Sequence, residues 1–230
     1  MKTVLEVQGL TFAYDSREPC LHELSFSVGE GECVGIVGAN GAGKSTLLWC
    51  LLGLLPARGA VNLLGEKWSK RNLARIGVVF QNPEDQLFMP TLLQDVTLPL
   101  LNRGAAAELA ATRAHAALRS MSLDRLAGRP ATQLSLGERK RASIAAALAG
   151  APEILFLDEP TAELDGRSVR QLTRVLTDLP IARVITSHHL DFLRSLASRL
   201  LVLSQGSIVA EGPTQQILSD TGLLESAGLI

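Results

Sequence analysis

The segment GANGAGKST, Gly38–Thr46, constrains the fold of this chain more than any other. It matches the pattern G-x-x-x-x-G-K-[ST] and lies between the apolar stretch CVGIV, Cys33–Val37, and a predicted helix from Lys44 to about Leu55. Glycines let successive backbone N–H groups point into one concavity, and the N-terminus of the helix adds partial positive charge. The order of strand, glycine loop and helix therefore predicts a phosphate-binding loop on an α/β sheet.

Two side chains of this loop carry the expected chemistry. Lys44 supplies a point charge for the β- and γ-phosphates of a nucleotide, and the Ser45 hydroxyl can ligate Mg²⁺. The loop alone predicts nucleotide binding and does not select one family of nucleotide-binding proteins.

The rest of the chain alternates strands and helices, which predicts a mostly parallel sheet. Residues up to about Glu32 alternate apolar and polar side chains, so we expect an antiparallel β subdomain formed by about 1–32 and 57–80. Alanine and leucine dominate about 90–150, which predicts an inserted helical subdomain. Further strands are expected at Ile76–Phe80, Glu153–Pro160, Ala182–His188, Arg199–Ser204 and Ser207–Gly212, and helices at about Arg167–Asp178 and Leu190–Ser198.

Composition favours a single globular domain covering residues 1–230. The chain is 47% apolar and 20% charged, and its net charge of -1 gives no reason to expect nucleic acid as a partner. The most apolar run, Leu47–Pro56, is far shorter than the ~20 residues that span a bilayer, and no secretory signal is recognised. The cysteines Cys20, Cys33 and Cys50 lack metal-ligand spacing, so we expect reduced, structural thiols in a cytosolic compartment.

Polar side chains follow two of the predicted strands. Asp158 and Glu159 end a buried strand, where ligand sites of open α/β sheets form, so Asp158 is a candidate Mg²⁺ holder and Glu159 a candidate for polarising the attacking water. His188 and His189 follow a second strand, and one imidazole there could sense a γ-phosphate. His115 is expected to be structural or on the surface.

The stretch QLSLGERKRASIAAAL, Gln133–Leu148, predicts a helix that begins with an anomaly. Ser135 and Glu138 have the spacing of a capping box, yet Gly137 lies between them and costs about 1 kcal/mol relative to alanine in a helix interior. The glycine is either tolerated, or something approaches its backbone closely.

The order of these motifs resembles that of the ATP-binding cassette (ABC) ATPases over essentially the whole chain. The order is the phosphate loop (Walker A), Gln81 after a strand, LSLGE, the acidic strand end (Walker B), AELD, and a histidine. LSLGE resembles the family signature, usually L-S-G-G-Q, with Leu136 and Glu138 as departures. The resemblance implies a head-to-tail dimer that holds each ATP between the Walker A of one chain and the signature of the other. The negative charge of Glu138 should weaken that contact somewhat.

The resemblance also assigns roles to individual residues. Tyr14 resembles the aromatic residue that stacks on adenine, Gln81 the glutamine that touches Mg²⁺ and couples to a membrane partner, and His188 the switch histidine. Residues that match the remaining motifs are Gly38, Asn40, Gly41, Gly43, Lys44, Ser45 and Thr46 around the phosphates, Ser135 and Gly137 in the signature, Asp158 and Glu159 in Walker B, and Asp165 in the motif AELD, which the family calls the D-loop.

A narrower resemblance lies in the segment QNPEDQLFMPT, Gln81–Thr91. It is similar to the corresponding segment of the ATPases of cobalt and nickel importers and of the wider energy-coupling-factor group. Importers of that group also take up vitamins such as biotin. The resemblance implies an integral membrane partner and a place on the cytoplasmic face of the inner membrane. The alternatives are an ABC ATPase of another transporter class, a non-transport ABC protein of DNA repair or translation, and a small P-loop kinase or GTPase. The last predicts an N-K-x-D motif, and no Asn-Lys pair occurs in the sequence.

Overall fold

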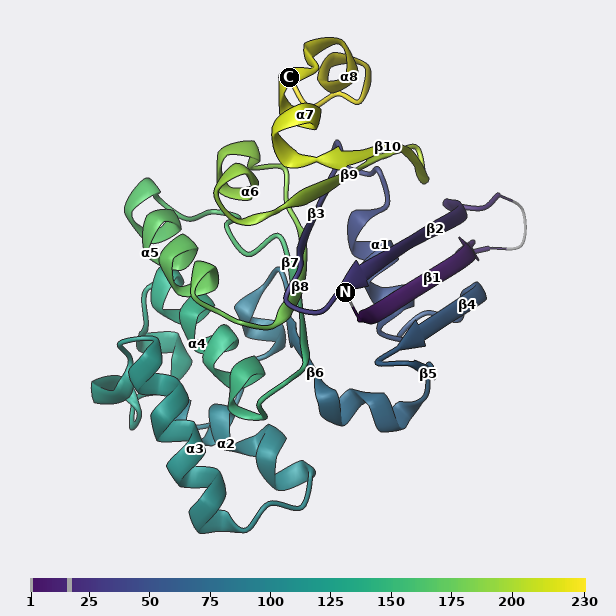
Figure 1. The fold of residues 1–230 in the computed structure, drawn as a ribbon. Coiled ribbons are helices and arrows are strands. Elements are labelled where there is room, and N and C mark those ends of the chain that lie inside the picture. Colours follow the sequence, from purple (N-terminus) through teal and green to yellow (C-terminus); the bar gives the residue numbers. More distant parts are fainter. Residues whose placement is uncertain (1, 16–17) are drawn as a thin grey trace. The chain divides into compact units, whose positions relative to one another are not determined.

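The computed structural model describes residues 2–15 and 18–230, and the chain divides into two compact units. The first unit holds the chain up to Leu73 together with Pro180–Ile230, and the second holds Ala74–Leu179. Figure 1 labels the elements of both units along the sequence. The second unit is therefore an insertion between two segments of the first.

The first unit contains an antiparallel sheet built from the N-terminal strands. Its strands run in the order β2-β1-β4-β5, and neighbouring strands are antiparallel. Along β2, buried Leu24, Phe26 and Val28 alternate with exposed residues, as expected for a strand with one face toward the core. The prediction of an N-terminal antiparallel sheet is confirmed. The bounds are β1 Thr3–Phe12, β2 Leu21–Gly29, β4 Arg58–Leu63 and β5 Glu66–Lys67.

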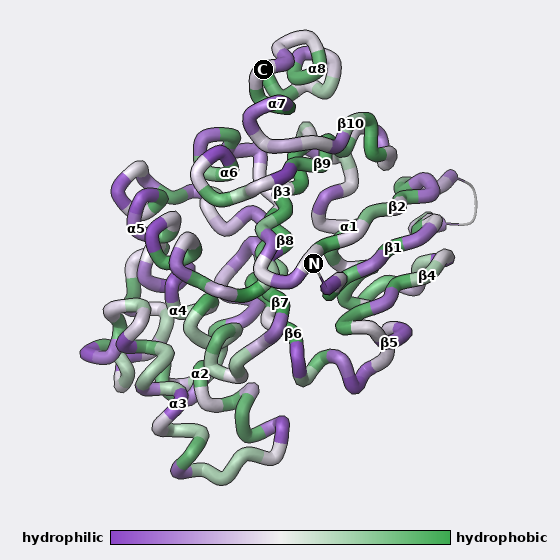
Figure 2. Tube along the Cα trace, viewed as in Figure 1, coloured by the Kyte–Doolittle hydropathy of each residue, from purple (hydrophilic) through white to green (hydrophobic). Residues whose placement is uncertain are grey.

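The same unit contains the parallel strands that lead into the phosphate loop. Strand β3 (Cys33–Val37) lies between β8 (Ala182–Thr186) and β9 (Arg199–Ser204), parallel to both, and β10 (Ser207–Pro213) adds an antiparallel edge. All five residues of β3 and of β8 are buried, and hydrophobic residues dominate these strands in Figure 2. Because β3 and β8 are parallel neighbours, the loops that follow them leave the sheet at the same edge.

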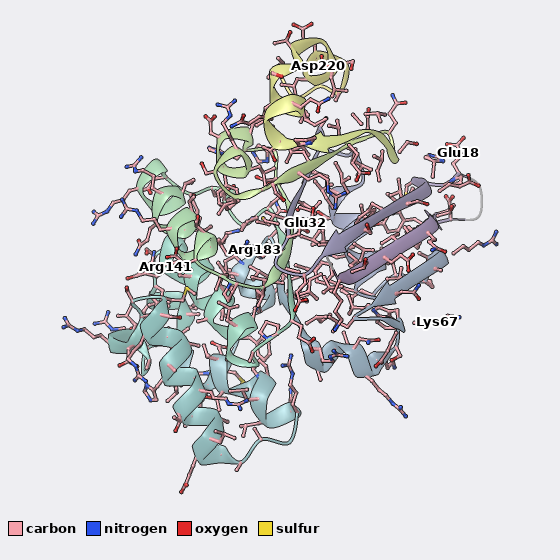
Figure 3. The ribbon with its side chains drawn as sticks, in the orientation of Figure 1. Glu18, Glu32, Lys67, Arg141, Arg183 and Asp220 are labelled. Atoms are coloured by element: carbon pink, nitrogen blue, oxygen red, sulfur yellow. The ribbon has the colours of Figure 1, made fainter. Side chains whose placement is uncertain are left out.

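The helices of the first unit are short. They are α1 (Lys44–Leu51), α6 (Leu190–Leu196), α7 (Thr214–Ser219) and α8 (Thr221–Ser226). The predicted extension of α1 to Leu55 is wrong, because Gly53 adopts a φ of +65° and a Cβ there would lie 2.2 Å from the Trp68 ring. Helices α7 and α8 were not predicted. The carboxylate of Asp220, labelled in Figure 3, begins α8 by accepting a hydrogen bond from the Leu223 N–H (2.9 Å).

The second unit combines two parallel strands with four helices. The parallel strands are β6 and β7, and α2, α3 and α4 contact one another. Alanines fill most of the buried face of α4, which lets this helix pack closely against β6. The predicted helical insertion is confirmed. The bounds are β6 Ile76–Val79, β7 Ile154–Asp158, α2 Leu92–Asn102, α3 Ala107–Ser120, α4 Leu136–Ala149 and α5 Gly166–Thr177, with 3₁₀ turns at Pro83–Asp85, Asp124–Leu126 and Ala131–Gln133. A further 3₁₀ turn, Lys70–Arg75, covers the residues at which the first unit ends and the second begins.

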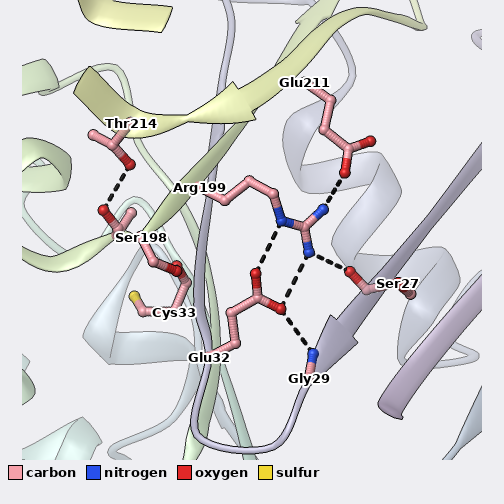
Figure 4. Close-up of polar contacts among 9 residues, drawn as sticks. Ser27, Gly29, Glu32, Cys33, Ser198, Arg199, Glu211 and Thr214 are labelled. Atoms are coloured by element: carbon pink, nitrogen blue, oxygen red, sulfur yellow. Dashed lines mark hydrogen bonds and ion pairs between the residues drawn. The ribbon is translucent and has the colours of Figure 1, made fainter. Parts of the chain in front are cut away.

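An ion-pair network joins the antiparallel sheet to the parallel strands within the first unit. Glu32, at the turn before β3, accepts two hydrogen bonds from the Arg199 guanidinium, at 2.9 and 3.2 Å, and one from the Gly29 N–H at 2.8 Å (Figure 4). Arg199 also donates to the Ser27 carbonyl oxygen (2.6 Å) and to the Glu211 carboxylate. The side chains of Arg199 and Glu32 are only 20% and 18% exposed, so water screens this pair weakly.

This network should make the fold sensitive to acid. Burial opposes ionisation of Glu32, but hydrogen bonds from Arg199 and Gly29 outweigh it and lower the pKa of the carboxyl. A carboxyl with a lowered folded pKa stabilises the fold above its unfolded pKa of about 4.3, and that stabilisation is lost as the pH falls through the folded pKa. We expect Arg199→Met to reduce the free energy of unfolding by about 2 kcal/mol at pH 7, and by progressively less below pH ~4.

Urea unfolding across this pH range measures the effect. Arg194→Met is the matched control, because its ion pair with Asp191 (3.1 Å) is largely exposed and should contribute under about 0.5 kcal/mol. A loss for Arg199→Met that is no larger than the control, or that is independent of pH, would contradict the expectation.

Candidate functional site

The phosphate loop has the backbone that its glycines predicted. Gly41 and Gly43 adopt φ values of +83° and +104°, a region that favours glycine. A Cβ on Gly38 would lie 2.4 Å from the Leu203 carbonyl oxygen, and one on Gly43 would lie 2.9 Å from Cδ2 of Leu21. The loop therefore needs glycine both for its conformation and for its close packing on neighbouring segments.

Lys44 and the start of α1 form a site suited to an anion. The Lys44 side chain is buried, and its ammonium donates to the carbonyl oxygens of Gly38 (2.8 Å) and Ala39 (3.2 Å), which hold it across the loop. Helix α1 has no side-chain cap and no acidic residue in its first turn. Its N-terminus thus presents backbone N–H donors and partial positive charge beside a lysine, and these donors fit the phosphates of a nucleotide.

Tyr14 lies close to this loop. Its hydroxyl is 3.0 Å from Oγ1 of Thr46, in the first turn of α1, and its ring meets that of Phe12 edge to face at 4.9 Å. The side chain is nevertheless 64% exposed. An aromatic ring held in place yet open to solvent, next to a phosphate loop, is suited to stacking on a base.

The two histidines after β8 differ in their surroundings. His189 begins α6, because its Nδ1 accepts a hydrogen bond from the Phe192 N–H (3.2 Å), and its own N–H donates to the Ser187 hydroxyl (3.0 Å). His189 is thus a helix cap, and His188 remains the candidate switch residue. The Ser187 N–H donates to the Ile36 carbonyl oxygen (3.1 Å), so the histidine turn leaves the sheet next to the end of β3.

The second unit places the remaining candidates at the ends of β6 and β7. Val79 pairs with Leu157, so Gln81 and the acids Asp158 and Glu159 follow these strands at the same edge. Both acids are buried, and Glu159 adopts a φ of +42°, a region that is uncommon for residues other than glycine. The structure therefore holds the proposed catalytic carboxylate in a strained conformation.

The predicted capping box at the start of α4 is confirmed. The Ser135 hydroxyl and backbone N–H both donate to the Glu138 carboxylate at 2.8 Å, and the Glu138 N–H donates to the Ser135 hydroxyl oxygen at 3.4 Å. These hydrogen bonds, aided by the charges of Arg141 and Arg129, lower the pKa of Glu138. Glu138 therefore stays ionised. Its carboxylate accepts a hydrogen bond from the Ser135 hydroxyl, the group that the family resemblance assigns to phosphate binding.

Gly137 has a neighbour within its own unit that the sequence did not predict. A Cβ on Gly137 would lie 2.8 Å from the Ser168 Oγ and 3.4 Å from the Ser168 Cβ, in the first turn of α5. Arg141, labelled in Figure 3, donates from its Nη1 to Oε1 of Gln171 (3.0 Å), which also links α4 to α5. Asp165 begins α5 by accepting a hydrogen bond from the Ser168 N–H (2.7 Å). The close approach of Ser168 therefore gives a second reason for glycine at this position.

Sequence reasoning missed two residues that hold this region together, Lys140 and Gln86. Lys140 is a buried lysine on α4, and its ammonium donates to the Gln81 carbonyl oxygen. The available signal was helical spacing, since Lys140 precedes buried Ile144 by four residues and so lies on the same face of the helix. Gln86 is hydrogen-bonded to both β6 and α4.

The other expectations concern cysteines, metals and membranes. Cys20, Cys33 and Cys50 are free, and burial raises the pKa of Cys33 to about 11 and of Cys50 to about 12, so both remain thiols. His115 pairs through Nδ1 with Asp124 (2.8 Å) on a half-exposed surface, a structural role.

Within residues 2–15 and 18–230, no group of three or more His, Cys, Asp or Glu side chains is arranged to hold a metal ion, and no helix is long and apolar enough to cross a membrane.

The sequence model of the family described as "ABC transporter" matches residues 21–162, more than half of the chain. The chain belongs to this family. A putative ABC transporter ATP-binding protein from Gloeobacter violaceus is 43% identical, over 98% of this chain and 95% of its own length. The energy-coupling factor transporter ATP-binding protein EcfA of Methanothermobacter thermautotrophicus is 38% identical, over 98% of this chain and 76% of its own length.

Solved structures of ABC cassettes share the fold. CbiO1 from Clostridium perfringens, described as part of the ABC transporter complex cbiONQ, superposes with a TM-score of 0.86 and 28% identity, covering 100% of this chain and 96% of its own. A dimeric post-hydrolysis state of the cassette MJ0796 with ADP and Pi superposes with a TM-score of 0.82 and 30% identity, covering 91% and 98%. This chain is therefore an ABC ATPase with the fold that the motifs predicted.

The packing of Gly137 predicts a coupling between two helices. In the native background, the strain of Gly137→Ala against Ser168 should offset the gain of about 1 kcal/mol that alanine brings to a helix. In a Ser168→Ala background the hydroxyl is gone, and the same change should stabilise the fold by about 1 kcal/mol. A double-mutant cycle of urea unfolding measures this difference. If the changes in unfolding free energy of the two single variants add up to that of the double variant within about 0.3 kcal/mol, Ser168 does not constrain Gly137.

Proposed function

We propose that this chain is the ATP-hydrolysing subunit of an importer of the energy-coupling-factor type, acting through a separate transmembrane partner. The observation that carries the proposal is the segment Gln81–Thr91, QNPEDQLFMPT, whose pattern is typical of that group. The similarity to EcfA and to CbiO1 over nearly the whole chain supports it. The proposed cargo is a divalent metal ion such as cobalt or nickel, or a vitamin such as biotin.

The loop after Gln81 has features that suit a docking partner. The Phe88 side chain is 66% exposed, although its backbone is firmly held. The carboxylate of buried Asp95, on α2, accepts hydrogen bonds from the N–H groups of Phe88 and Met89, both at 2.8 Å. A rigidly presented aromatic side chain is typical of interface anchors. We propose that this loop contacts the membrane partner, which would hold the chain at the cytoplasmic face of the inner membrane.

The proposed roles of the site residues follow their chemistry. Lys44 and the loop from Gly38 to Thr46 bind the phosphates of ATP, and Tyr14 stacks on adenine. Glu159 orients and polarises the attacking water, and His188 contacts the γ-phosphate. Ser45, Gln81 and Asp158 offer the oxygen ligands that Mg²⁺ prefers, and the ion would neutralise charge on the β- and γ-phosphates when bound.

A second ATPase chain, identical or not, is the other proposed partner. Ser135, Gly137 and Asp165 of one chain would act on ATP held by the other, and the dimeric cassette with ADP and Pi supports this arrangement. Such a dimer would have two states, closed with ATP bound and open after hydrolysis, and the bound nucleotide would decide which state is favoured. We expect no nucleic acid among the partners.

The catalytic role of Glu159 can be tested on the purified chain. Glu159→Gln keeps the shape of the side chain but removes its basic character, so we expect ATP turnover to fall by about 100-fold or more with ATP affinity nearly unchanged. Steady-state turnover and equilibrium binding of ATP measure the two quantities. Glu108→Gln, an exposed change on α3, is the matched control. Unchanged turnover in Glu159→Gln would remove the proposed mechanism.

The importer assignment needs the intact membrane complex. We expect an integral membrane protein to co-purify with the chain, and one solute among Co²⁺, Ni²⁺ and biotin to stimulate ATP turnover of the reconstituted complex by several-fold. Phe88→Ala should weaken this association, because it removes an exposed aromatic anchor. A chain that purifies without a membrane protein and hydrolyses ATP with no response to these solutes would favour another ABC class.

A further inference from the structure

Helix α4 carries a buried positive charge at an unusual place. Lys140 lies five residues after Ser135 and is only 2% exposed, and lysine is almost never fully buried unless it is paired. Its ammonium donates a hydrogen bond to the carbonyl oxygen of Gln81. The segment 81–86, which we call the Q-loop, is thus held at its start by a side chain of the helix that the signature residue Ser135 caps.

The charges of the acids beyond β7 act on the same ammonium. Burial lowers the pKa of Lys140, and the negative charges of Glu163, Asp158 and Glu159 act in the opposite direction. The effect of these charges on Lys140 is electrostatic attraction rather than a direct hydrogen bond, and all of these residues belong to the same compact unit. Asp158 and Glu159 are themselves buried, so little water screens the attraction.

Gln86 provides a second link between α4 and the Q-loop. Its side-chain amide donates to the carbonyl oxygens of Ser143 on α4 (2.9 Å) and Val78 on β6 (3.2 Å). Together, Lys140 and Gln86 hold both ends of the segment 81–86 to the same helix. A shift of α4 would move the Q-loop with it, and it would also move the positive charge that acts on the Walker B acids.

We infer that Lys140 is a positioning residue for ATP hydrolysis, which joins the signature helix to the Q-loop backbone and whose charge acts on the Walker B carboxylates. Its hydrogen bond fixes the place of the Gln81 backbone, and its positive charge attracts the carboxylates that follow β7. The inference rests on the proposed roles of Gln81 and Glu159. Lys140 supplies no group to the substrate itself, so removing it should slow the chemical step more than it weakens ATP binding.

Three variants separate the charge from the hydrogen bond. Lys140→Met removes both, Lys140→Gln keeps a neutral donor, and Lys140→Arg keeps a positive donor. We expect Lys140→Met and Lys140→Gln to lower kcat by about 10- to 100-fold, with KM for ATP within about threefold of the native value. Lys140→Arg should recover most of kcat. Lys70→Met, the same change at an exposed lysine, is the matched control and should leave both constants unchanged.

A purely structural role predicts a different pattern. In that case kcat would follow the free energy of unfolding across the three variants, and KM would change together with kcat. That result would overturn the inference, as would a kcat within threefold of the native value in Lys140→Met, or full recovery by Lys140→Gln. If Lys140→Met fails to fold, the comparison of Lys140→Arg with Lys140→Gln decides by the same criteria.

Glu159→Gln, measured in parallel, separates this inference from the proposed function. If Glu159→Gln hydrolyses ATP normally, the proposed mechanism fails and the role of Lys140 fails with it. If Glu159→Gln is inactive while Lys140→Met keeps native kcat and KM, the proposed mechanism stands and only the role of Lys140 is overturned.

Discussion

The first unit depends on the complete burial of β3 between two parallel neighbours. Every residue of β3 is buried, and Gly35 has no room for a Cβ, which would lie 2.5 Å from Cδ2 of Leu200. A strand enclosed in this way can place polar chemistry only where the chain leaves the sheet, at its carboxyl end. The phosphate loop begins at that end, and the histidine turn after β8 leaves the sheet beside it.

Local rules of protein structure are broken where the proposed chemistry lies. Helix α1 begins without a side-chain cap, Glu159 adopts a positive φ, and Lys140 is a buried cation. Each feature is unfavourable for a chain that only has to fold, yet each suits a highly charged ligand. Helices α2 and α5, by contrast, begin with side-chain caps, from Thr91 and Asp165.

Residues close together in the sequence were predicted well, and contacts between distant segments were not. The capping box of Ser135 and Glu138 could be read directly, because its two halves are three residues apart. The close approach of Ser168 to Gly137 could not be read, because Ser168 comes from another helix. The early end of α1 has the same origin, since the Trp68 ring occupies the space beside Gly53.

The sequence by itself determined the family and the order of strands and helices up to β10, and it predicted which residues bind phosphate, because motifs and periodicity are local properties of the chain. Only the tertiary structure decided how those residues are supported. It assigned His189 to a helix cap, placed the Ser135 hydroxyl on Glu138, and brought the ammonium of Lys140 to the Gln81 backbone. The physical reason is that burial and long-range hydrogen bonds depend on which distant segments pack together, and side-chain type alone does not specify that packing.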